Sequence, residues 1–187
     1  MGASGAEWLV RPERELEENP DLALKLLEIP EGSVVADIGA GVGYYSLKIA
    51  SIVGPKGKVY ASDVQPEMLR LLRKRLEKSN VRNVEPVLAG VSETNLPAGA
   101  MDIVLLVDVY HEFSEPQKML ASIAKSLKPS GKLILLEFRE EDPKVPIRPE
   151  HKMSVATVNK ELEAEGFTME KLIPDLPWQH ILVFAKR

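Results

Sequence analysis

The residues best suited to bind a ligand lie where an apolar run gives way to closely spaced glycines. Positions 34–45 read VVADIGAGVGYY, so an acid, Asp37, stands two positions before Gly39. Glycine lets the main chain turn tightly and approach a ligand closely. A carboxylate beside such a turn attracts a cation and repels a pyrophosphate. The segment therefore favours a positively charged ligand.

A second acid, Asp63, follows the next apolar run, 22 residues after Gly41. In doubly wound folds, a carboxylate at about this distance accepts hydrogen bonds from ribose hydroxyls. The dinucleotide fingerprint G-x-G-x-x-G needs a third glycine where this chain has Tyr44, and no Gly-Lys-Ser/Thr follows as in a phosphate-binding loop. A nicotinamide-dependent oxidoreductase and a nucleoside triphosphatase are thus disfavoured. The implied ligand carries a ribose without a diphosphate.

Short apolar runs alternate along the chain with segments of helical periodicity, the pattern of βαβ units. We predict an α/β fold: a doubly wound, seven-stranded, mostly parallel sheet with helices on both faces. The strands are expected at 34–38, 59–63, 84–88, 102–107, 132–138, 168–173 and 180–185, and the helices at 45–53, 66–78, 116–127 and 154–165. The connection 174–179 is too short for a crossover helix, so the last two strands should form an antiparallel hairpin.

The N-terminal part of the chain is expected to form a separate structural segment. Residues 7–28 read as one or two helices broken at Asn19-Pro20. We predict a helical lid over residues 1–30, preceding a ligand-binding domain over 31–187. Arg11 and Arg14 are expected to be solvated helix charges, and residues 140–149, with three prolines, a loop.

At its glycine turn the chain resembles the class I S-adenosylmethionine-dependent methyltransferases, whose first motif is an acid-x-Gly-x-Gly-x-Gly turn after the first strand. The resemblance covers about 34–187 and includes the acid after the second strand, Leu96-Pro97 before the fourth, and an L-K-P-S-G-K-L turn at 127–133. It implies S-adenosyl-L-methionine as the cofactor.

The resemblance also implies which residues meet the cofactor. Asp37 and the main chain of Gly39, Ala40, Gly41 and Gly43 should border its methionyl part, Asp63 should bind its ribose, Val64 and Gln65 should flank the adenine, and Gly90, Val91 and Asp108 should complete the site. Many relatives have an acid after the third strand that meets the adenine amino group, and residues 88–92 offer none. Ser92 or a main-chain group is the available substitute.

The methyl acceptor should bind beyond the carboxyl ends of the strands. The fourth predicted strand runs into Asp108-Val109-Tyr110-His111-Glu112-Phe113, which lacks the Asn/Asp-Pro-Pro-Tyr/Phe motif of adenine- and amide-nitrogen methyltransferases. We predict His111 as a general base, because its ordinary pKa lies near neutrality, and Tyr110 as a wall of the acceptor site. Local hydrogen bonding by His111 and ordinary packing by Tyr110 remain the alternatives.

All three histidines, His111, His151 and His180, fall in segments expected at the same end of the sheet. They could collect a divalent metal with Asp108 or Glu112. However, their spacing matches no helix-borne zinc motif, so no metal is expected.

Composition narrows the function further. Lys and Arg number 24 against 28 Asp and Glu, a net charge of −4 with no basic block, so nucleic acid is a poor partner. The absence of cysteine excludes thiol nucleophiles and fits a reducing cytoplasm. No apolar run approaches the roughly 18 residues of a membrane span.

We therefore predict S-adenosylmethionine-dependent methyl transfer to a small-molecule acceptor by in-line displacement. The alternatives are methylation of a protein or RNA side group, and a non-catalytic module that binds the same cofactor. The acceptor atom and the oligomeric state stay open.

Overall fold

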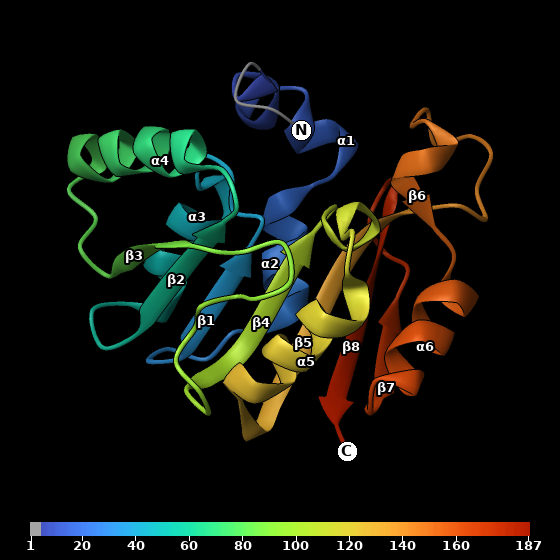
Figure 1. The fold of residues 1–187 in the computed structure, drawn as a ribbon. Helices are drawn as coiled ribbons and strands as arrows, with labels where there is room; N and C mark the ends of the chain where they lie inside the picture. Colours follow the sequence, from blue (N-terminus) through green and yellow to red (C-terminus); the bar gives the residue numbers. More distant parts are fainter. Residues whose placement is uncertain (1–4) are drawn as a thin grey trace.

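The computed structural model describes residues 5–187, so the first four residues of the predicted lid lie outside the described part. Its centre is one sheet with the strand order β3-β2-β1-β4-β5-β8-β7 (Figure 1). The strands are β1 (Val34–Ile38), β2 (Lys58–Asp63), β3 (Val84–Leu88), β4 (Met101–Val107), β5 (Leu127–Arg139), β6 (Lys152–Met153), β7 (Phe167–Ile173) and β8 (Gln179–Lys186). β1 to β5 are parallel to one another, and β8 is antiparallel to both β5 and β7. The predicted doubly wound sheet and its reversed terminal hairpin are confirmed.

The sheet differs from the prediction in one added strand and in the start of β5. The two-residue strand β6, which pairs with β5 at Phe138 and Arg139, makes an eighth strand that the sequence pattern does not show. β5 begins at Leu127 and not at 132, because Leu127 already pairs with Met101 on β4. The pairing of β4 with β5 shifts register between Met101 and Ile103. Because of this irregularity, residues 127–131, expected as a turn, are part of β5.

Helices cover both faces of the sheet, as predicted. α2 (Pro20–Leu27), α3 (Tyr44–Val53) and α4 (Pro66–Ser79) pack on one face, and α5 (Pro116–Ser126) and α6 (Val155–Ala164) pack on the other. Successive strand side chains point to opposite faces of the sheet. Val35 therefore packs in the apolar cluster with α2, α3 and α4, and Ala36 packs in the cluster with α5 and α6. Prolines in the first turns of α4 and α5, together with a Ser154 side-chain cap on α6, start these helices locally.

The N-terminal segment divides into two parts. The short helices η2 (Trp8–Val10) and α1 (Arg14–Glu17) lie above the edge where the parallel strands end, whereas α2 is part of the core (Figure 1). The break at Asn19-Pro20 is confirmed: Asn19 adopts a left-handed conformation and its side chain caps α2. Over residues 5–187, no helix is long and apolar enough to span a bilayer.

Candidate active site

A cavity of about 770 Å³ opens at the carboxyl ends of β1, β2 and β4. One side of it is formed by the N-terminal segment through Trp8, Leu9 and Arg14, and the other by the loop before β6 through Pro146 and Ile147. Both segments rise above the same edge of the sheet (Figure 1). Among the residues predicted from the sequence, its wall contains Gly39, Gly41, Asp63, Val64, Gln65, Val91, Asp108 and His111.

The glycine turn after β1 brings main chain to this cavity. Gly39 has φ +71°, and a Cβ built on it would strike the side chain of Val109. Gly41 has φ +54°, and its added Cβ would lie 2.8 Å from Leu9. The amides of Gly39 and Ala40 donate to the Ser62 carbonyl over 2.8 and 3.0 Å, which ties the turn to the end of β2. The turn is therefore held between two loops with room for main chain alone.

Asp63 ends β2 in the cavity wall and is almost fully buried. Its Oδ2 accepts the Gly41 amide and its Oδ1 accepts the Gln65 amide, each over 2.8 Å. A carboxylate has about four acceptor positions, so both oxygens keep capacity for ligand hydroxyls. Beside it, Val64 and Val91 are 47% and 59% exposed and offer apolar surface to a planar ring.

Several predicted residues lie behind the wall rather than in it. Asp37 is buried and accepts a 2.5 Å hydrogen bond from the Ser46 hydroxyl. Burial raises the pKa of Asp37 to about 6, although the Ser46 hydrogen bond and the charge of Arg14 oppose the rise. Ala40, Gly43 and Gly90 are also absent from the wall. These residues shape the loops that the cavity residues extend from.

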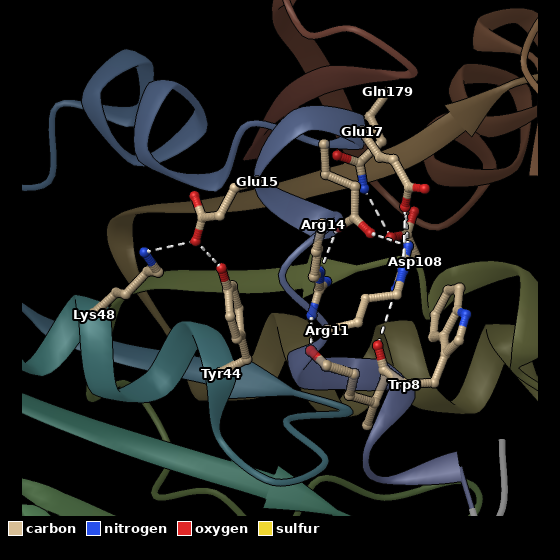
Figure 2. A network of polar contacts seen from close by, with 11 residues as sticks. Trp8, Arg11, Arg14, Glu15, Glu17, Tyr44, Lys48, Asp108 and Gln179 are labelled. Atoms are coloured by element: carbon tan, nitrogen blue, oxygen red, sulfur yellow. Dashed lines mark hydrogen bonds and ion pairs between the residues drawn. The ribbon is translucent and has the colours of Figure 1, made fainter.

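Asp108 follows β4 in a left-handed conformation, with φ +53°. Its Oδ2 accepts a 2.7 Å hydrogen bond from the Gln179 side chain (Figure 2). Asp108 lies in the cavity wall, and its Oδ1 is buried without a hydrogen-bond partner among the described residues. Burial, followed by the charges of Glu18 and Glu137, raises the pKa of Asp108 well above its ordinary value. An unpartnered buried carboxyl oxygen is costly, and a cationic ligand group would relieve that cost.

Arg14 is buried, which corrects the expectation of a solvated helix charge. Its Nε donates to Glu18 over 2.6 Å, its Nη1 donates to the Leu9 carbonyl over 2.9 Å, and its guanidinium lies 4.6 Å from the Tyr44 ring centre (Figure 2). Arg11 stacks 3.6 Å from the Trp8 ring centre and pairs with Glu17. Most of these contacts order the N-terminal segment itself, and the contact of Arg14 with Tyr44 joins it to α3.

At the other end of the cavity, η3 (Tyr110–Glu112) follows β4 and carries His111. The His111 Nδ1 lies 2.7 Å from Oε2 of Glu137, a fully buried residue of β5. The His111 Nε2 lies 3.2 Å from Nδ1 of His151 on η4 (Pro149–His151). Glu137 was missed by the sequence analysis, although a lone acid inside the apolar run LILLEF is a visible signal of it.

Tyr110, predicted as a wall of the acceptor site, and His180, considered as a metal ligand, do not line the cavity. Tyr110 is buried in the core cluster formed with α5 and α6, and its hydroxyl donates to Glu161 over 2.7 Å. Because neighbouring side chains of the η3 turn point in different directions, Tyr110 points into the core while His111 points to the cavity. His180 is buried on β8 opposite Glu137 and is absent from the wall, so only two of the three histidines meet.

Comparison with known proteins agrees with this architecture. Residues 35–131 match the family model described as "Methyltransferase domain". The chain is 34% identical to a "Ubiquinone/menaquinone biosynthesis C-methyltransferase UbiE" of Ectopseudomonas mendocina over 62% of this chain and 45% of that protein. A UbiE of Vibrio vulnificus is 36% identical over 57% of this chain and 42% of that protein. The chain thus spans less than half the length of these curated relatives.

The comparison with solved structures covers nearly the whole chain. A SAM-dependent methyltransferase from Aquifex aeolicus has a TM-score of 0.92 and 29% identity, covering 98% of each chain. The sheet order, the glycine turn and Asp63 lie within the matched region. The chain belongs to the methyltransferase domain family and is a class I S-adenosylmethionine-dependent methyltransferase by fold.

Proposed function

We propose that this protein transfers a methyl group from S-adenosylmethionine to a small-molecule acceptor held in the same cavity. The observation that carries the proposal is the convergence of the glycine turn, Asp63 and Asp108, whose Oδ1 lacks a partner among the described residues, on one cavity at the carboxyl ends of the strands. This set matches a nucleoside that carries a cationic amino acid: hydroxyls for Asp63, an ammonium group for Asp108, and a planar base for Val64 and Val91.

The residues have distinct tasks in this proposal. Asp63 accepts the ribose hydroxyls, and its two existing amide bonds hold the carboxylate in place for them. The main chain of Gly39 and Gly41 lies along the methionyl part. Asp37 supports the turn from behind through Ser46, which replaces the direct contact expected from the sequence. Gln65 and Val91 complete the adenine slot.

The acceptor end of the cavity is walled by Phe113, Pro146 and Ile147 around His111. Apolar walls with a few polar groups suit a small organic molecule. Since a cavity of about 770 Å³ must also hold the cofactor, the room left favours a compact acceptor. The curated relatives are named as ubiquinone/menaquinone biosynthesis C-methyltransferases. This similarity supports an acceptor of aromatic or enol type.

The protein contributes chiefly by alignment, because the cofactor, when bound, supplies an activated methyl group. Holding the reacting atoms in line removes roughly 7–11 kcal/mol of the barrier in well-oriented systems. Trp8, Leu9 and the loop before β6 limit the access of water to the cavity. His111 lines the acceptor end of the cavity, and Nε2 is its available ring nitrogen, since its Nδ1 is engaged by Glu137.

Methylation of a protein or RNA side group and a purely regulatory binding module are the competing functions. The test is to supply methyl-labelled cofactor and a lysate, separate the products by size, and measure S-adenosylhomocysteine. The proposal expects turnover with label in the small-molecule fraction. Label confined to macromolecules contradicts the acceptor class, and cofactor binding without turnover over a broad acceptor panel supports the module.

The lack of cysteine supports a cytoplasmic location as part of this proposal.

A further inference from the structure

We propose that His111, Glu112 and His151 form a binding site for a divalent transition-metal ion at the acceptor end of the cavity. Each contributes one ligand atom, and these atoms all lie within 4.8 Å of one another. All three residues are in the wall of the same cavity. The site departs from the expectation from sequence that no metal is bound. The ion's binding rests on these side chains alone, and only its part in the reaction rests on the proposed function.

The distance between the two imidazoles fits a shared ion. His111 Nε2 and His151 Nδ1 lie 3.2 Å apart, with ring centres at 5.2 Å. Two histidine nitrogens at the usual 2.0–2.1 Å from a tetrahedral zinc ion lie about 3.3 Å apart. The two nitrogens are also close enough to share a hydrogen bond, which a bound ion would replace.

The buried acid behind His111 supports ligation independently. Glu137 has no exposed surface, and its Oε2 lies 2.7 Å from His111 Nδ1. A carboxylate acceptor places the proton on Nδ1, which leaves the Nε2 lone pair facing His151. Metal-binding histidines usually donate their second ring N–H to a carboxylate or carbonyl in this way, and such partners change metal affinity by about 10- to 100-fold.

Two histidines and one carboxylate are the ligand set of open metal sites, which keep at least one position for water or substrate. Because all three side chains line the cavity, a bound ion would be reached from it. An acceptor hydroxyl bound there would lose its proton to solvent more readily, because the ion stabilises the oxyanion. The ligands come from η3 and η4, so the ion would also fasten the loop before β6 across the acceptor. The chemical class inferred for the acceptor is a hydroxyl-bearing small molecule, such as a phenol or enol.

The test is metal binding by the whole protein. Chelator-treated protein is titrated with Zn²⁺ by calorimetry and with Co²⁺ by visible absorption. We expect one ion per chain and the absorption of low-symmetry, four- or five-coordinate cobalt with nitrogen ligands. Affinity should fall about 10-fold or more in His111→Ala, His151→Ala and Glu112→Gln. Glu115→Gln, at a half-buried acid, and Glu150→Gln, at an exposed acid, both outside the ligand set, are the matched controls and should bind as the unchanged protein does.

Glu137→Gln tests the orientation of His111 without touching a ligand. The glutamine amide can donate to Nδ1, which moves the imidazole proton to Nε2 and should weaken Zn²⁺ binding about 10- to 100-fold. Zn²⁺ or Co²⁺ bound no more tightly by the unchanged protein than by a His111→Ala/His151→Ala double variant overturns the proposal. S-adenosylmethionine titrated into the metal-free protein separates the outcomes: cofactor binding without metal binding leaves the proposed function standing.

Discussion

Glu137 and His111 form a buried carboxylate–imidazole pair that also holds the turn after β4. Oε2 of Glu137 lies 2.7 Å from His111 Nδ1, and Oε1 accepts the amides of Val109 and Tyr110 over 3.2 and 2.9 Å. The Glu137 side chain on β5 thus holds both the main chain of the loop after β4 and the His111 ring that this loop presents to the cavity.

Two substitutions of Glu137 should separate hydrogen bonding from charge. Glu137→Leu leaves the Val109 and Tyr110 amides without an acceptor, so we expect a loss of about 2–4 kcal/mol in the free energy of unfolding. Glu137→Gln keeps an acceptor oxygen and should lie closer to the unchanged protein. Urea unfolding measures both. Equal destabilisation by the two variants would show that the charge, and not the hydrogen bonds, stabilises the turn.

A pair of glycine substitutions tests the packing of the turn after β1. Gly39 and Gly99 have similar angles, φ +71° and +60°, but an added Cβ meets Val109 at Gly39 and open space at Gly99. Gly99→Ala should cost about 1 kcal/mol from backbone strain alone. Gly39→Ala should cost a further 1–3 kcal/mol or so from overpacking. Equal unfolding free energies for the two variants would contradict the close approach of Val109.

The raised pKa of Asp37 should make the free energy of unfolding of the ligand-free protein depend on pH. Its pKa is about 6 in the folded state against 3.8 for an ordinary aspartate, mainly because it is buried. The folded state therefore holds the proton more tightly, and stability should fall as pH rises from about 4 to about 6, by up to about 3 kcal/mol.

Asp37→Asn should remove that decline, since asparagine does not titrate and can still accept from Ser46. The charges of Arg14 and Asp63 also act on Asp37 and are the same in both proteins. The measurement is the difference in unfolding free energy between the two proteins across this pH range. A constant difference contradicts the raised pKa.

Much of the fold could be predicted from local pattern. The apolar runs, the prolines in first turns and the short 174–179 connection predict most strands, the helices and the terminal hairpin, because these depend on residues close in sequence. β6 and the early start of β5 could not be predicted from local pattern. A two-residue strand and an irregular strand pairing depend on contacts with the neighbouring strand.

The candidate site divides in the same way. Asp63 and Gly41 lie at spacings that the fold fixes, so their places in the wall follow from sequence. The side-chain directions of Tyr110 and His111 depend on the η3 turn, and that turn depends on Glu137, 26 residues after His111. Arg14 was taken for a surface charge because nothing near it in sequence shows that Tyr44 and Tyr45 cover it.

The buried pair of Arg14 and Glu18 should matter for the N-terminal segment. Arg14→Met leaves the buried Glu18 carboxylate with Arg11, 3.4 Å away, as its remaining ionic partner, and the expected loss is up to about 3–5 kcal/mol. Arg14→Met/Glu18→Leu should recover much of that loss. Arg70→Ala, which breaks an exposed pair with Glu67, is the control and should cost less than about 1 kcal/mol. A double variant as unstable as the single one would contradict the role given to the buried Glu18 charge.

The central claim is that the cavity beside Asp63 holds S-adenosylmethionine by its ribose, and titration calorimetry with this compound tests it most directly. We expect one molecule per chain. Asp63→Ala, once shown by thermal unfolding to be folded, should bind about 10- to 10⁴-fold more weakly, because one or two charge-assisted hydrogen bonds of about 1.5–3 kcal/mol each are lost. Glu67→Gln should bind unchanged. No measurable binding by the unchanged protein, or equal affinity in Asp63→Ala, would contradict the account.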